Sequence, residues 1–172
     1  MNKYKKIEAF SLIELLVVIA VFGILASTGG PMMSAFIEQR QGNNAYKLLA
    51  NNIDSARSAA RDSTSIYSQI LIIPNDPSAD PDWMKGWKVR AQTSDGKILS
   101  DQPAFDSTSF KMTSDQFTAS NPITFNRRGY LSQVGSLVLT PNKCGSSSHT
   151  YTITLARSGL SNTSKSACTS TP

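Results

Sequence analysis

Residues 10–25 read Phe10-Ser-Leu-Ile-Glu14-Leu-Leu-Val-Val-Ile-Ala-Val-Phe-Gly-Ile-Leu25, an apolar run with one acidic residue near its start. After Glu14, no charged residue occurs before Glu38. A helix rises about 1.5 Å per residue, so this stretch is long enough to cross a bilayer core of roughly 30 Å. Because a carboxylate within a membrane-spanning helix is costly, Glu14 is expected to have a partner or a function.

Two simple interpretations of this segment fit poorly. A secretory signal peptide has a basic end, an apolar stretch and a small-residue cleavage site. The basic end is present here, but Glu14 interrupts the apolar stretch, and the residues after Leu25 (Ala-Ser-Thr-Gly-Gly-Pro) make a poor cleavage site. A plain membrane anchor is possible but gives Glu14 no role.

The stretch Lys5-Lys-Ile-Glu-Ala9-Phe10-Ser-Leu-Ile-Glu14 resembles the leader and N-terminus of type IV pilins and pseudopilins. In that family, a prepilin peptidase cuts before the Phe and methylates its new amino group. The resemblance therefore implies cleavage between Ala9 and Phe10 and N-methylation of Phe10. The residue before the cut is usually Gly, so Ala9 departs from the pattern. The family also commonly carries a proline at mature residue 22, which is Pro31 here, and we expect a helix bend there.

The resemblance gives Glu14 a role in subunit assembly. A protonated amine at Phe10 and a carboxylate at Glu14 are each costly in lipid, whereas a pair formed between neighbouring subunits is largely neutral. In the family, this pairing sets the register of a newly added subunit. The alternative is that Glu14 lies at the level of the lipid headgroups and has no part in assembly.

Composition points to one secreted domain beyond the helix. The chain has 172 residues and a formal net charge of +5, to which the leader residues Lys3, Lys5, Lys6 and Glu8 contribute +2. The remaining +3 is too small to indicate nucleic-acid binding. By the positive-inside rule, the leader lysines favour a cytoplasmic N-terminus, which places the rest of the chain in the periplasm or outside the cell.

The two cysteines, Cys144 and Cys168, lie near the C-terminus and belong to no metal-binding motif. An oxidising compartment favours a disulfide between them, and two free thiols are the alternative.

The helix is predicted to continue as an amphipathic segment, residues 38–64, because Leu49, Ile53, Ala56 and Ala60 recur at helical spacing. Arg57 and Arg61 lie on another face and are expected to be solvated. We expect Gly42 to weaken the helix and the helix to end near Thr64.

Beyond residue 65 the period changes to that of β-strands. Strands are predicted at 66–73, 87–93, 97–100, 110–113, 123–125, 137–140 and 151–155, with a hairpin turn at Ser94-Asp-Gly96. One long helix followed by strands predicts an α+β fold. The expected organisation is a cleaved leader (1–9), a transmembrane and filament-core helix (10–37), its amphipathic continuation (38–64) and a periplasmic antiparallel β domain (65–172).

Two further motifs resemble the GspH/FimT group of minor pilins and pseudopilins. Trp83-Met-Lys-Gly86-Trp87 is similar to a Trp-x-x-Gly-Trp element, and Phe125-Asn-Arg-Arg-Gly129 is similar to a Phe-x-x-x-Gly turn. By themselves, the aromatic residues are expected in the core and the glycines in turns. A binding role for the tryptophans is the alternative.

Some FimT-like members of the group bind DNA through a Gly-Arg-x-Arg element near the C-terminus. The matching stretch here, residues 157–162, reads Arg-Ser-Gly-Leu-Ser-Asn and lacks both arginines after the glycine. Arg127 and Arg128, with Lys143 and Lys165, remain as a possible basic patch, but nucleic-acid binding is not expected.

The sequence does not indicate an enzyme. The single histidine, His149, follows a Ser-rich stretch without a nucleophile motif. Asp76, Asp80 and Asp82 do not have EF-hand spacing, and prolines separate them, so a polar loop is expected instead of a calcium site. No cofactor and no metal are predicted.

The resemblance implies a FimU-like minor type IV pilin that helps to start a pilus and lies at or near its tip. Implied partners are other minor pilins, the major pilin, the prepilin peptidase and the inner-membrane assembly platform. The protein would lie in the inner membrane before assembly and in the extracellular pilus afterwards. The alternatives are a minor pseudopilin of type II secretion and a DNA-binding pilin of natural transformation.

Mass spectrometry of the membrane-extracted protein tests the cleavage. The expected product lacks residues 1–9 and begins with N-methylated Phe10. An intact chain that still begins at Met1 would contradict the prediction.

Overall fold

The structure, a computed structural model, describes residues 11–62, 67–93, 96–105, 109–144 and 148–168, without the side chains of residues 25–36 and 38. The chain divides into two compact units, Met1–Ile37 and Glu38–Pro172. Each unit is described by itself below.

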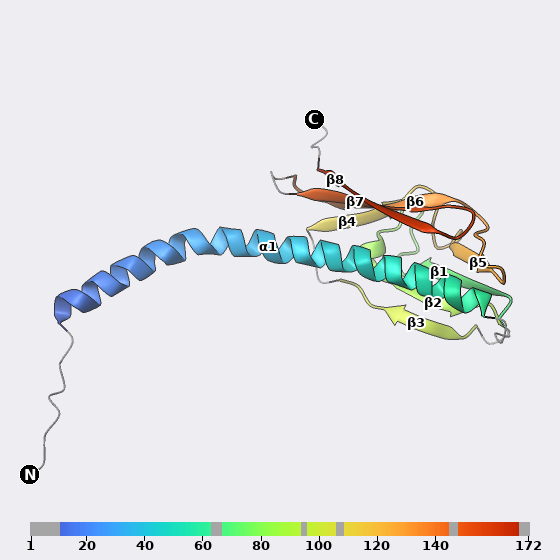
Figure 1. The fold of residues 1–172 in the computed structure, drawn as a ribbon, viewed down its shortest axis with the longest axis horizontal. Coiled ribbons are helices and arrows are strands. Elements are labelled where there is room, and N and C mark those ends of the chain that lie inside the picture. Colours follow the sequence, from blue (N-terminus) through green and yellow to red (C-terminus); the bar gives the residue numbers. More distant parts are fainter. Residues whose placement is uncertain (1–10, 63–66, 94–95, 106–108, 145–147, 169–172) are drawn as a thin grey trace, which may run out of the picture. The chain divides into compact units, whose positions relative to one another are not determined.

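One helix, α1 (Leu12–Arg61), extends over 50 residues (Figure 1). The helix ends at Arg61, a few residues before the predicted end near Thr64, which lies outside the described residues. The backbone is helical through Gly29, Gly30 and Pro31 and again at Gly42, so none of these residues ends the helix. The bend at Pro31 stays a prediction.

Eight strands follow the helix and form two four-stranded sheets, in the orders β3-β2-β1-β5 and β4-β6-β7-β8. Every pairing is antiparallel. The strands are β1 (Gln69–Pro74), β2 (Trp87–Ala91), β3 (Ile98–Gln102), β4 (Phe110–Ser114), β5 (Ile123–Asn126), β6 (Gly135–Pro141), β7 (His149–Leu155) and β8 (Ser161–Ala167). A short 3-10 helix, η1 (Trp83–Lys85), precedes β2. The predicted α+β class is confirmed, with the helix placed before an antiparallel β domain.

The outer half of α1 packs into the core that it shares with the sheets. Its buried residues recur on one face, and the four predicted from spacing are among them: Ala45, Tyr46, Leu49, Ile53, Ala56 and Ala60. Gly42 has a packing role, because a side chain there would meet the ring of Phe110 on β4. On β1, β2 and β7, buried residues alternate with more exposed ones, as expected for sheets with one covered face.

Strand β8 was not predicted from the sequence. Its residues, Ser-Asn-Thr-Ser-Lys-Ser-Ala, show no apolar alternation, and six of the seven are exposed. The strand forms because it pairs with β7 along its whole length, from Leu155 opposite Ser161 to His149 opposite Ala167. Backbone hydrogen bonds thus define this strand without side-chain burial.

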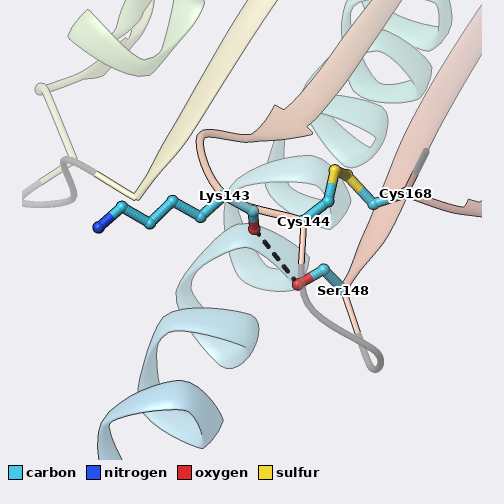
Figure 2. Close-up of a disulfide and its surroundings, with 4 residues drawn as sticks. All are labelled: Lys143, Cys144, Ser148 and Cys168. Atoms are coloured by element: carbon cyan, nitrogen blue, oxygen red, sulfur yellow. Dashed lines mark hydrogen bonds between the residues drawn. A yellow bond between two sulfur atoms is a disulfide. The ribbon is translucent and has the colours of Figure 1, made fainter. Parts of the chain in front are cut away.

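A disulfide joins Cys144, which follows β6, to Cys168, which follows β8 (Figure 2). Their Cα atoms lie 5.5 Å apart, across 24 residues of sequence. Beside it, the Cys168 amide donates to the Ser148 carbonyl at 3.0 Å, and the Ser148 hydroxyl donates to the Lys143 carbonyl at 3.5 Å. Closing a loop of this length contributes about 3 kcal/mol through chain entropy and holds the polar edge strand on the sheet.

Alanine variants of two neighbouring leucines test which face of α1 packs into the core. Leu49 is fully buried, whereas Leu48 is 37% exposed. Leu49→Ala should reduce the free energy of unfolding in urea by about 2–5 kcal/mol, because it leaves a cavity in the core. Leu48→Ala makes the same chemical change on the other face and should cost less than about 1 kcal/mol. Equal losses for the two variants would contradict this packing.

Candidate functional site

The first part of α1 exposes apolar side chains over its whole circumference. Ten of them, between Leu12 and Ile24, are from 43% to 80% exposed: Leu12, Ile13, Leu15, Leu16, Val17, Val18, Ile19, Val21, Phe22 and Ile24. A helix that is apolar on all sides is stable when another apolar environment covers it, either lipid or other helices. This segment is therefore an interaction surface.

Glu14 is the only acidic residue in this segment and lies in the first turn of α1. Its amide donates to the Ser11 carbonyl at 3.0 Å, and the Leu15 amide donates to the same carbonyl at 3.2 Å. The side chain is exposed, and its negative charge is favourable at the positive end of the helix dipole. The cleavage residues Ala9 and Phe10 lie outside the described residues, so the pairing of Glu14 with an amine stays a prediction.

The part of the chain that the structure describes contains no helix both long and apolar enough to cross a membrane.

Both tryptophans of the Trp-x-x-Gly-Trp element are completely buried. Trp83 lies on η1, and Trp87 begins β2 and contacts the ring of Phe105 at 5.7 Å between centroids. Gly86, between them, has φ +93°, and a side chain there would meet the Gln102 carbonyl. A left-handed φ and this close approach both require glycine. The burial supports the structural interpretation of the motif and leaves the tryptophans inaccessible to a ligand.

The Phe-x-x-x-Gly element forms the turn that follows β5. Phe125 is buried and pairs with Ile70 on β1, while Gly129 adopts φ +75°. The Asn126 side-chain oxygen accepts the amides of Arg128 and Tyr130 at 2.9 and 3.0 Å, which fixes the turn. Arg127 and Arg128 are exposed, and the Arg127 Nε donates to the Tyr67 carbonyl at 3.0 Å.

The aspartates of residues 76–82 stabilise a loop, as predicted. Asp76 is buried and accepts Lys85 Nζ at 2.9 Å and the amides of Asp82 and Ser78 at 3.1 and 3.2 Å. These contacts, that with Lys85 first, hold the pKa of the Asp76 carboxyl well below its usual range. Asp82 Oδ1 accepts the amides of Met84 on η1 and Met112 on β4. Among the described residues, no group of potential ligands is arranged for a metal ion.

Sequence reasoning missed one cluster of arginines. Arg57 is half-buried, and its Nη2 donates to the Ser158 carbonyl at 3.2 Å, so the expectation that it is simply solvated was wrong. Arg61 lies against the turn at Gly129. Arg127 and Arg128 directly precede this glycine in the sequence. The only sequence signal at this place is the pair of turn glycines, Gly129 and Gly159, which does not by itself predict that Arg57 and Arg61 lie against them. His149 is half-buried on β7 opposite Ala167, away from this cluster.

The fold combines a long helix, apolar over its first part, with an antiparallel β domain. Two family models match the chain: the prokaryotic N-terminal methylation motif over residues 4–29, and the type II transport protein GspH over residues 45–159. Because the second match covers more than half of the sequence, the chain belongs to the GspH family of minor pilins and pseudopilins. The family consists of structural proteins, which confirms the prediction of a non-enzyme. Membership also implies association with other pilin-like subunits.

Two solved structures have the same fold, both of the type IV minor pilin FimU from Pseudomonas aeruginosa (strain PAO1). The crystal form in space group P21 gives a TM-score of 0.56 at 19% identity and covers 74% of this chain and 90% of that chain. The P65 form gives 0.51 at 18% identity and covers 71% and 91%. No curated protein matches the sequence.

The pKa of Asp76 predicts a pH dependence of stability. A carboxyl whose pKa is lowered by folding stabilises the protein above its unfolded pKa of about 4, and this contribution decreases as the pH falls further. Asp76→Asn should therefore lower the melting temperature at about pH 7, with the difference from wild type shrinking between about pH 4 and about pH 2. Circular dichroism at several pH values measures the melting temperatures of the variant and of wild type.

Asp101→Asn is the matched control, because Asp101 pairs with Lys88 at 3.8 Å and both side chains are exposed. Its effect should be smaller at neutral pH. A constant difference for Asp76→Asn across the pH range would contradict the role given to its charge.

Proposed function

We propose that the protein is a minor type IV pilin that helps to prime pilus assembly and lies at or near the pilus tip. The observation that carries the proposal is Glu14, a single acid near the start of α1, within a segment from Leu12 to Ile24 whose apolar side chains are exposed. A helix of this composition needs other helices or lipid around it. The β domain supplies a separate folded unit that other subunits can contact.

In this proposal, the chain is cut before Phe10 and held in the inner membrane by residues 10–37. Only part of this segment has described side chains, those of residues 11–24 and Ile37. The Glu14 carboxylate of one subunit pairs with the Phe10 amine of a neighbour, because either charge alone is costly in an apolar environment. Pairing lowers the barrier to the first contacts of a filament, when few neighbouring helices are available to set the register.

Two lines of support favour the pilus. The two solved structures with this fold are of a type IV minor pilin, and the disulfide-held β domain suits an extracellular location. The description of the matching family, a type II transport protein, favours the alternative of a minor pseudopilin in type II secretion. Both machines would use Glu14 in the same way, so variants of Glu14 do not distinguish them. The two functions are distinguished by which process, pilus formation or type II secretion, fails when the gene is deleted.

The amount of sheared surface pili in a strain without this gene, beside its parent and a complemented strain, tests the proposed function. We expect a large loss of pili that complementation restores. Normal piliation with reduced secretion of type II substrates would replace the proposal with the alternative. Normal piliation with reduced uptake of DNA would replace it with a role in transformation.

The same strain tests Glu14. Complementation with Glu14→Leu, which removes the charge and preserves the apolar helix, should leave pili at the level of the deletion strain. Glu14→Gln should fail similarly, because it keeps the shape of the side chain without its charge. The melting temperature of the purified variants should equal that of wild type, since Glu14 lies outside the unit formed by Glu38–Pro172. Full piliation with Glu14→Leu would show that the acid is not needed.

A further inference from the structure

Charge is distributed unevenly along the chain. Residues 116–172 contain no Asp or Glu, but they contain five basic residues: Arg127, Arg128, Lys143, Arg157 and Lys165. The acids of the β domain lie before this segment, where three of them pair with Lys85, Lys88 and Lys111. The C-terminal third therefore carries positive charge without acidic residues of its own to balance it.

The fold brings three of these basic residues to the end of α1. The turn at Gly129, after β5, contacts the turn at Gly159, between β7 and β8, because a side chain on Gly159 would meet the Gly129 carbonyl. Arg57 and Arg61 lie against the same two turns. The Leu131 amide donates to the Arg157 carbonyl at 3.0 Å, which ties the turns together. We call the set of Arg57, Arg61, Arg127, Arg128 and Arg157 the arginine end. Figure 1 shows the elements that carry these residues: the end of α1, the segment after β5 and the segment between β7 and β8.

The arginine end has no acidic partner among the described residues. None of its five guanidinium groups takes part in an ion pair there. The nearest acid on α1 is Asp54, which accepts the Ser161 hydroxyl at 3.0 Å, and Asp62 directly follows the end of the helix. Arg57 Nε is buried and has no hydrogen-bond acceptor within the part of the chain that the structure describes. Five guanidinium groups on neighbouring elements, without an ion pair among the described residues, favour a negatively charged partner.

Two apolar side chains are exposed on the same turns. Tyr130, next to Gly129, is 48% exposed, and Leu160, next to Gly159, is 57% exposed. Because the two glycines touch, these side chains extend from neighbouring points of the backbone. A combination of arginine with aromatic and apolar residues is characteristic of the centre of protein interfaces.

We propose that the arginine end, with Tyr130 and Leu160, is a docking surface for an acidic segment of another protein. Carboxylates of that segment pair with the exposed guanidinium groups, whose planar shape suits bidentate contacts. Apolar side chains between the carboxylates cover Tyr130 and Leu160. This inference uses residues of the unit Glu38–Pro172 alone and does not depend on the role proposed for Glu14.

The apolar residues favour a protein partner over a nucleic acid. Contacts with phosphates need cations and gain nothing from an exposed leucine such as Leu160. A peptide with acidic and apolar residues satisfies both parts of the surface. The balance of the unit, 14 basic against 10 acidic residues from residue 38 onward, is also modest for general binding to a polyanion.

Fluorescence anisotropy with the full-length protein in neutral detergent tests the proposal. The probe is a short labelled peptide of alternating Asp and Leu, compared with a Ser–Leu peptide and with a short DNA duplex. We expect the Asp–Leu peptide to bind more tightly than either, with an affinity that falls as salt is added. Leu160→Ser should weaken binding of this peptide about threefold or more, since its apolar contact is lost.

Charge-reversal variants distinguish binding at the arginine end from an effect of the protein's net charge alone. The double variant Arg128→Glu/Arg157→Glu should weaken binding about tenfold or more, since two attractive contacts become repulsive. These side chains donate no hydrogen bond within the described residues, so the fold should be kept, as circular dichroism would show. Lys143→Glu/Lys165→Glu makes the same change in net charge away from the arginine end and should have a much smaller effect.

Three results would overturn the proposal. Equal losses for the two double variants would mean that only net charge matters. Tighter binding of the DNA duplex than of the Asp–Leu peptide, through the same arginines, would make the surface a nucleic-acid site. Absence of peptide binding at low salt would mean that the arginine end has no such role.

Discussion

Burial of one face of α1, from Ala45 to Ala60, is the interaction on which the folded unit depends. Without the helix, each four-stranded sheet would expose the apolar face formed by residues such as Ile72 and Ile153. Small residues at Gly42, Ala45 and Ala56 let the helix approach the sheets closely. The helix therefore supplies the common core for two sheets that share no hydrogen-bonded strand.

The two halves of the same helix differ in whether the chain itself covers their apolar side chains. Its outer half is covered within the chain, whereas the residues from Leu12 to Ile24 expose apolar side chains. The chain therefore buries the apolar face of the outer half of the helix in its own core and leaves the apolar side chains of the first part for another apolar environment to cover. Because exposed apolar surface drives association without regard to direction, we propose that the single charge of Glu14 fixes the register of neighbouring subunits.

Glycines with left-handed backbone determine the other surface of interest. Gly129 and Gly159 let two turns touch beside the end of the helix, and this contact collects arginines that are up to 100 residues apart in the chain, from Arg57 to Arg157. Strand β8 then leaves from the second of these turns, and the Cys144–Cys168 disulfide holds its far end. A polar strand can persist here because the backbone ladder and the covalent link do not require buried side chains.

The sequence by itself determined the long helix, its buried stripe and seven of the eight strands, because periodicity and residue type record which side chains must avoid water. It favoured a disulfide between Cys144 and Cys168, which the structure contains. It also marked Glu14, since an acid in an apolar run stands out without any structure. Only the tertiary structure decided β8, the η1 turn around Trp83 and the arginine end. These features depend on backbone pairing and on contacts between distant turns, and neither leaves a local pattern of apolar residues.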